Sequence, residues 1–136
     1  MLTITIPGEM RGKGRPRFSA RGGFARAYTD SKTANAEAWV KHCAVTQAGT
    51  APIEGAVSIA ITIDVVPPAS WAVRKKANAL AGAFFPTSKP DLDNIAKLIA
   101  DALNGIVWRD DKQIVRMVLA KRYAPTAQAV LTVVEV

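Results

Sequence analysis

Two short acidic segments carry the residue types best suited to chemistry. The first is Lys89-Pro90-Asp91-Leu92-Asp93-Asn94, and the second is Trp108-Arg109-Asp110-Asp111. Together they hold four of the eleven acidic residues in a chain whose formal net charge is +7. Carboxylate oxygens are the ligands that Mg²⁺ takes, and bound magnesium can activate water and relieve charge in phosphodiester hydrolysis. The acidic segments therefore predict a magnesium site for cleavage of a phosphodiester.

A helix over residues 91–104 is expected to position the first segment. Apolar residues recur along it at helical spacing, namely Leu92, Ile95, Ala96, Ile99, Ala102 and Leu103. Asp91 is a suitable N-cap, Asp93 falls in the first turn, and Gly105 can end the helix in the left-handed conformation. Lys97 then lies one turn after Asp93 and can stabilise charge on the phosphate.

The second segment can return to the start of this helix. The chain from Asn104 to Asp111 is long enough to reach back along it, so Asp110 or Asp111 can lie near Asp91 and Asp93. A structural explanation stays open beside the catalytic one. Asp91 would then be only a cap, Lys97 only an ion-pair partner for Asp93, and the second pair only a turn before a strand.

A basic segment over residues 8–29 predicts a polyanionic partner. The isoelectric point of the chain is about 9.9, and the segment is rich in glycine, which favours a long loop. We expect it to track DNA phosphates, although a mobile basic arm is the alternative. The candidate DNA contacts are Arg11, Lys13, Arg15, Arg17, Arg21, Arg26 and Lys32, with Arg74, Lys75, Lys76 and Lys89 further along the chain.

Hydrophobic periodicity predicts a single α+β domain over residues 1–136. Alternating apolar residues predict strands over 2–6, 56–66, 113–123 and 128–136, the last two forming a hairpin through Pro125. Helical spacing predicts helices over 32–48 and 71–81, in addition to that over 91–104, with Ser70 capping the second. The expected fold is a mostly antiparallel sheet of about four strands packed against helices.

The remaining features argue for a cytoplasmic location. Cys43 is the only cysteine, which excludes an intrachain disulfide, and its place on the apolar stripe predicts a buried structural thiol. His42 is expected at the surface, without a catalytic role. No apolar run is long enough to span a membrane, and the N-terminus predicts a strand instead of a targeting peptide. We expect no membrane partner.

The two acidic segments, taken with their neighbours, resemble the RusA family of Holliday-junction resolvases, and its phage and prophage branch in particular. The likeness includes Lys97, the run Lys112-Gln113-Ile114 after the second acidic pair, and the earlier segments Gly14-Arg15-Pro16-Arg17-Phe18 and Tyr28-Thr29-Asp30-Ser31-Lys32-Thr33. It also includes Pro68-Ala69-Ser70-Trp71. Two positions depart from the family pattern: Asp30 stands where proline is expected, and Pro90 stands where some members carry a basic residue.

This resemblance implies a homodimer that binds a four-way DNA junction and makes paired nicks with Mg²⁺, for which Mn²⁺ can substitute. By position, Asp91, Asp93 and Asp111 would be the essential metal-binding acids, Asp110 a fourth, and Lys97 the catalytic lysine. It further implies action on DNA in recombination and repair, in a bacterial or phage-infected cell at the nucleoid.

Two other functions remain open from the sequence. One is a non-catalytic module that binds nucleic acid, in which the acids only cap helices and turns. The other is a metal-dependent nuclease for flaps or single-stranded DNA, which shares the acids but does not need two sites acting together. Asp93 and Lys97 separate the first alternative from a nuclease, because a cap requires neither.

Overall fold

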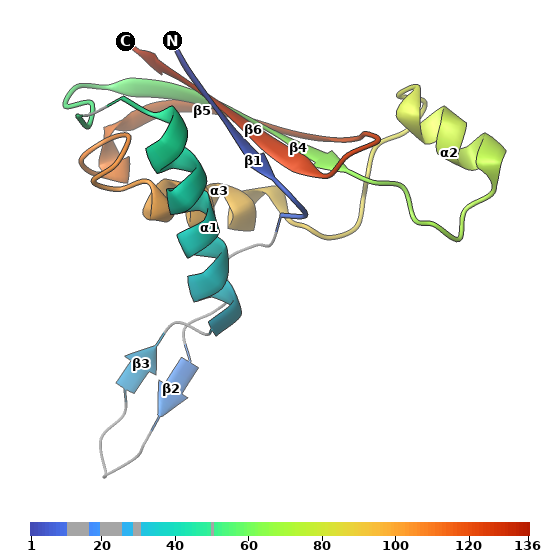
Figure 1. Cartoon of the computed structure of the whole chain (residues 1–136), viewed down its shortest axis with the longest axis horizontal. Coiled ribbons are helices and arrows are strands. Elements are labelled where there is room, and N and C mark those ends of the chain that lie inside the picture. Colours follow the sequence, from blue (N-terminus) through green and yellow to red (C-terminus); the bar gives the residue numbers. More distant parts are fainter. Residues whose placement is uncertain (11–16, 20–25, 29–30, 50) are drawn as a thin grey trace.

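A computed structural model of the chain describes residues 1–10, 17–19, 26–28, 31–49 and 51–136. Its main sheet contains β1 (Leu2–Pro7), β4 (Val57–Val65), β5 (Ile114–Tyr123) and β6 (Gln128–Glu135) in the order β1-β6-β4-β5 (Figure 1). β6 pairs antiparallel with β1 and with β4, whereas β4 and β5 are parallel. This mixed, mainly antiparallel sheet confirms the α+β class expected from the sequence.

The expected hairpin between the last two strands is wrong, because β4 lies between β5 and β6. The connection between them passes the end of β4, where the amide of Ala124 donates to the carbonyl of Val65 at 2.9 Å. The burial of the strands explains this order. Every second residue of β4 and β6 is buried over most of their length, but no residue of β5 is fully buried. β4 therefore takes a central position and β5 an edge.

Two helices cover one face of the sheet (Figure 1). They are α1 (Ser31–Gln47) and α3 (Leu92–Ala102), and they pack against each other as well as the strands. The core between the layers includes Val40 and Cys43 of α1, Leu98 of α3, and Ile59 and Ile61 of β4. This apolar contact fixes the position of α3 on the sheet. It therefore also fixes where the polar side chains of α3 lie relative to the strands.

The third helix, α2 (Val73–Leu80), lies at the far end of the molecule from the termini (Figure 1). It is shorter than expected, and its N-cap is Ala72 instead of Ser70. Aromatic rings anchor the segments on either side of it: Trp71 and Phe84 each lie less than 6 Å from the ring of Tyr123 at the end of β5.

The basic segment 8–29 is not without regular structure, which corrects the expectation of a simple loop. It contains a small antiparallel pair, β2 (Arg17–Ser19) and β3 (Arg26–Tyr28), separate from the main sheet. The glycine and proline content of this segment suggested a loop without regular structure. Strands of only three residues, however, fit between the glycines and prolines. Residues 11–16, 20–25 and 29–30 lie outside the described part of the chain.

The two remaining expectations on single residues are confirmed. The Cys43 side chain is buried, and burial raises the pKa of its thiol. His42 is exposed and stacks on Trp39. In the part of the chain that the structure describes, none of the helices has both the length and the apolar character needed to cross a membrane.

Candidate active site

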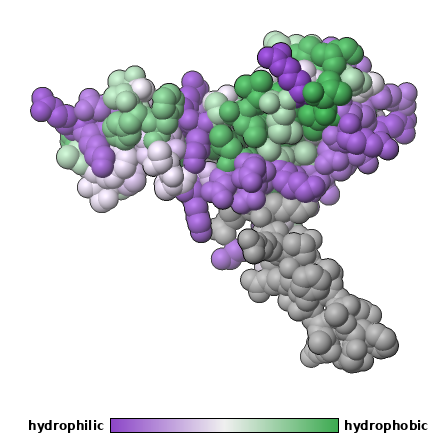
Figure 2. Space-filling model, turned by 180° about the vertical axis from the view of Figure 1, so that it is seen from behind, coloured by the Kyte–Doolittle hydropathy of each residue, from purple (hydrophilic) through white to green (hydrophobic). Residues whose placement is uncertain are grey.

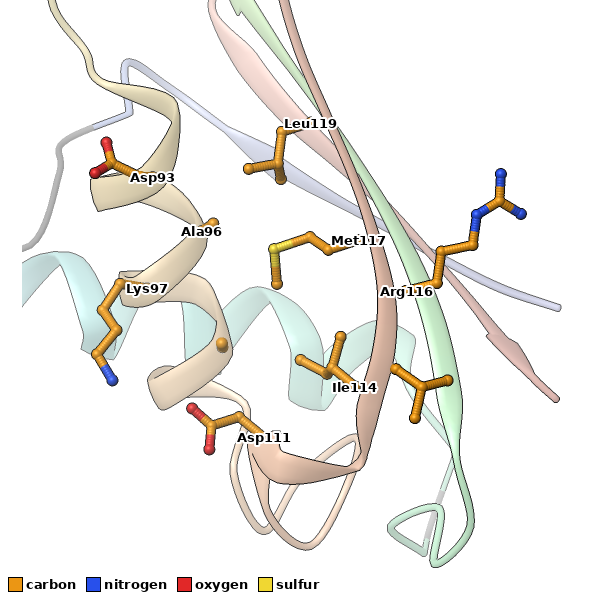
Figure 3. Close-up of a pocket in the computed structure, with 10 residues that line it drawn as sticks. Asp93, Ala96, Lys97, Asp111, Ile114, Arg116, Met117 and Leu119 are labelled. Carbon is orange, nitrogen blue, oxygen red and sulfur yellow. The ribbon is translucent and has the colours of Figure 1, made fainter.

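A pocket of about 460 Å³ lies between α3 and β5 (Figure 3). Asp93 and Lys97 line it from α3, and Asp111 lines it from the segment before β5. Its floor is apolar and consists of Ala96, Ala100, Ile114, Met117 and Leu119. The structure thus brings two of the expected acids and the expected lysine to one surface, although they are separated by up to 18 residues of sequence.

Asp93 stands in the first turn of α3, as expected. Its carboxylate makes no hydrogen bond or ion pair with any residue that the structure describes. Asp91 is the N-cap by backbone position, and its carbonyl accepts from the amide of Ile95 at 3.1 Å. The Asp91 side chain, however, makes no capping bond and only accepts from Asn94 Nδ2 at 3.4 Å. Helix capping therefore does not account for either carboxylate.

Lys121 of β5 holds the segment that leads into α3. Its ammonium donates to the carbonyl of Ser88 at 2.6 Å and to that of Pro90 at 3.0 Å. These bonds tie the residues just before Asp91 to the edge of the sheet, and the peptide between Lys89 and Pro90 is cis. Lys121 is thus a positioning residue for the start of α3, and the sequence analysis missed it.

A buried tryptophan holds the second acidic segment. Trp108 is fully buried, and its indole N–H donates to Asn104 Oδ1 at 3.0 Å. Gly105 has a φ of +80° after the end of α3, and its amide donates to the carbonyl of Trp108 at 2.7 Å. The chain therefore turns back tightly after α3, so that Asp110 and Asp111 follow near the last turn of this helix.

The two acids of this segment have different surroundings. Asp110 caps a short 3-10 helix, Asp111–Gln113, and accepts from the amide of Lys112 at 3.0 Å. This bond, with a hydrogen bond from Asp111, holds the pKa of Asp110 below its usual value. The pKa of Asp111 is raised, because burial disfavours its charge and because its protonated carboxyl donates to the carboxylates of Asp110 and Asp101. The turn interpretation thus applies to Asp110, whereas Asp111 faces the pocket.

Asp101 is a further acid at this site. It hydrogen bonds to Asp111 and forms an ion pair with Lys97 Nζ at 3.5 Å. Lys97 is therefore paired with Asp101, one turn later in α3, and not with Asp93 as the structural explanation supposed. The spacing of four residues from Lys97 was visible in the sequence, but nothing there distinguished the turn after Lys97 from the turn before it.

The acids suit Mg²⁺ by chemistry, but one chain does not gather them at one point. Among the residues that the structure describes, no group of three or more Asp, Glu, His or Cys side chains is placed to hold a metal ion. Figure 3 shows Asp93 near the start of α3 and Asp111 toward its other end, with Lys97 between them. A helix rises about 1.5 Å per residue, so Asp93 and Asp101, which touches Asp111, are roughly 12 Å apart along α3.

The candidate DNA contacts are distributed over the molecule. Lys32, Arg74, Lys75 and Lys89 are exposed, and Lys76 is half-buried. The ammonium of Lys75 lies 4.0 Å from the centre of the Trp71 ring, and this cation–π contact holds the Lys75 side chain against the ring. Arg11, Lys13, Arg15 and Arg21 lie outside the described residues, and Arg17 and Arg26 lie in β2 and β3, which are described by their backbone alone.

The fold and this pocket fit a small nuclease with acidic residues on a basic domain. The profile of the family described as "Endodeoxyribonuclease RusA" matches residues 7–134, nearly the whole chain. The chain therefore belongs to the RusA endodeoxyribonuclease family, whose members are hydrolases that act on branched DNA. It is also 31% identical to the uncharacterized protein YqaN of Bacillus subtilis (strain 168), over 99% of this chain and 96% of that protein.

Proposed function

We propose that this protein is a structure-selective, Mg²⁺-dependent endodeoxyribonuclease that resolves four-way junctions by paired, symmetric nicks. The observation that carries the proposal is the pocket shared by Asp93, Lys97 and Asp111 in a chain of the RusA family. The Asp93 carboxylate at the start of α3 is exposed and no described residue engages it, so it is available to a ligand.

The acids and the lysine have separate roles in this proposal. Asp91, Asp93 and Asp111 would hold the metal, and Asp110, which also caps the short helix Asp111–Gln113, would be a fourth acid beside them. Bound Mg²⁺, or Mn²⁺ in its place, supplies an activated water and relief of negative charge at phosphorus. Lys97 is 63% exposed and paired only loosely with Asp101, so its ammonium is free to turn toward an incoming phosphate.

Recognition of the junction rests on phosphates and on symmetry. A four-way junction presents equivalent strands related by a two-fold axis, and a homodimer presents two equivalent sites in the same relation. Exposed basic residues such as Arg74 on α2 and Lys32 at the start of α1 contact the backbone of the arms, which gives shape selectivity with little base readout. The basic segment 8–29 adds further phosphate contacts, and the substrate places the protein at DNA in the cytoplasm.

A binding module without catalysis is less consistent with the structure. In that case Asp91 and Asp93 would be expected to cap α3 or pair with Lys97. Neither side chain caps the helix, and Lys97 pairs with Asp101 instead. Asp110 alone behaves as a structural cap.

The variant Asp93→Asn tests this proposal, because it keeps the shape of an exposed side chain and removes its charge. Junction cutting should be abolished, while junction binding stays the same or tightens because repulsion of phosphate falls. Glu135→Gln at the end of β6 is the matched control, since it removes one exposed negative charge away from the pocket. Undiminished cutting by Asp93→Asn would overturn the proposal, as would an equal loss in the control; circular dichroism checks that both variants fold.

A further inference from the structure

A second pocket, of about 380 Å³, lies between the end of β1 and the first half of α1, and we call it the α1 pocket. A cavity of this size can hold a small ligand or a single group of a larger one. Glu9 and Met10, which follow β1, line one side of it. The residues on the other side recur every three or four positions and so share one face of α1, namely Lys32, Asn35, Ala36, Trp39 and Val40.

The tryptophan of the α1 pocket is held in one orientation. The indole N–H of Trp39 donates to the carbonyl of Pro7 at 2.7 Å, and the ring of His42 stacks on the Trp39 ring with 5.7 Å between their centres. Trp39 is nevertheless 46% exposed. An aromatic ring that is both fixed and accessible is a good stacking surface for a planar partner, since little conformational freedom is lost on binding.

The polar side chains of the α1 pocket suit a nucleotide. Lys32, Asn35 and Glu9 are exposed, and none of them makes a hydrogen bond or ion pair with a described residue. An ammonium binds a phosphate, while an amide and a carboxylate offer donors and acceptors to the edge of a base. A basic group beside an aromatic ring is the arrangement with which proteins hold unpaired bases of nucleic acids.

The position of the α1 pocket favours a base that belongs to a DNA strand. Glu9 and Met10 stand at the beginning of the basic segment 8–29, and Lys32 follows its end. A smaller pocket shares Glu9 and Met10 and extends to Pro90, where the chain enters α3. The two pockets therefore meet, and together they extend from α1 toward the acids at the start of α3.

We propose that the α1 pocket holds one unstacked nucleobase of a branched DNA substrate, with the base stacked on Trp39 and its phosphate bound by Lys32. The proposal rests on the proposed function for the choice of DNA, and it adds a binding site outside the acidic pocket. A base at a branch point stacks less fully than a base within a continuous duplex, so drawing it out costs less. The α1 pocket thereby adds selectivity for branches to that given by phosphate contacts.

Double-mutant cycles between Trp39 and the bases of a four-way junction test this proposal. Binding is measured by fluorescence anisotropy in EDTA, so that no strand is cut, and an abasic site replaces each nucleotide beside the branch point in turn. Trp39→Ala should bind the intact junction about tenfold more weakly than wild type, as expected for the loss of one base–aromatic stack. At the position whose base enters the pocket, the abasic junction should bind wild type and variant equally. The same ratio of affinities at every position would overturn the proposal.

The variant Trp39→Phe separates stacking from the structural role of the ring. It loses the hydrogen bond to Pro7 but keeps an aromatic face. Its affinity for the intact junction should therefore stay within about threefold of wild type. A loss as large as that of Trp39→Ala would overturn the proposal, because the bond to β1 and not stacking would then carry the effect.

Phe85→Ala is the matched control. Phe85 is 64% exposed in the segment that follows α2. At the end of the molecule that α2 forms, hydrophobic and hydrophilic residues also lie side by side on the surface (Figure 2). Phe85→Ala should bind the intact and the abasic junctions as wild type does. A coupling to the same base as large as that of Trp39→Ala would overturn the assignment of this base to the α1 pocket.

The same titrations separate this proposal from the proposed function. A wild type that binds junctions in preference to linear duplex, without coupling between Trp39 and any base, overturns only the α1 pocket. A wild type with no preference for the junction overturns the proposed function. The coupling of Trp39 to the bases of whichever DNA binds then still decides whether the pocket holds a base.

Discussion

Replacing Lys121 by methionine should impair cutting without unfolding the protein. The change keeps the aliphatic stem of this half-buried side chain and removes the ammonium that donates to the carbonyls of Ser88 and Pro90. These bonds hold the segment that enters α3 at Asp91. Loss of the ammonium therefore loosens the position of Asp91 and Asp93, even though the Lys121 ammonium bonds to the carbonyls of Ser88 and Pro90 and to neither carboxylate.

The size of the effect follows from the two bonds. A hydrogen bond from a charged donor contributes about 1.5–3 kcal/mol when it is sheltered from water. Because Lys121 is partly exposed, we take about 1.5 kcal/mol for the pair together. Since about 1.4 kcal/mol is a factor of ten, local opening before α3 should become about tenfold more frequent. Junction cleavage and Mn²⁺ affinity should each fall by up to about tenfold.

Hydrogen exchange and cleavage kinetics measure this together. Exchange should quicken at amides near the start of α3, and not in the buried strand β4. Lys41→Met is the matched control, because Lys41 is exposed on α1 and makes no hydrogen bond or ion pair with a described residue. Lys121→Arg should restore part of the activity. Cleavage by Lys121→Met at the wild-type rate, or an equal loss of cleavage rate in Lys41→Met, would refute the positioning role of Lys121.

Three further predictions concern the rest of the chain. Trp108→Ala should lower the free energy of unfolding by about 3–5 kcal/mol, because it leaves a cavity at a fully buried ring; denaturant titration checks this, and Trp108→Phe should lose less. Neutralising Arg15 and Arg17 should weaken junction binding and make its log–log salt dependence shallower by up to about 1.8, or about 0.9 for each phosphate contact; an unchanged slope would remove both residues from the interface. The Cys43 thiol should react with an aromatic disulfide reagent only as fast as the protein unfolds, since burial raises its pKa and hides its sulfur; rapid labelling of the native protein would contradict its structural role.

The elements of this fold were largely predictable because their periodicity is strong. α3 and the four strands of the main sheet were expected within a few residues, since alternation and helical spacing directly encode which side chains are buried. Sheet order was not predictable in the same way. The short link around Pro125 suits a hairpin, and only the greater burial of β4 places that strand between β5 and β6.

The candidate site was predictable as a set of residue types and less so as an arrangement. The sequence indicated that Asp93, Lys97 and Asp111 could meet, and the structure places all three around one pocket. The sequence did not show that Lys97 pairs with Asp101, because Asp93 stands one helical turn before Lys97 and Asp101 one turn after it. Nor did it reveal Lys121, whose role depends on carbonyls more than 30 residues away.

Cleavage of an end-labelled synthetic four-way junction, in Mg²⁺ and in EDTA, beside a linear duplex of the same sequence, tests the central claim most directly. The account predicts paired nicks at symmetric positions, in the junction only and only with the metal. Tight binding of the junction with no cutting under Mg²⁺ or Mn²⁺ would contradict it.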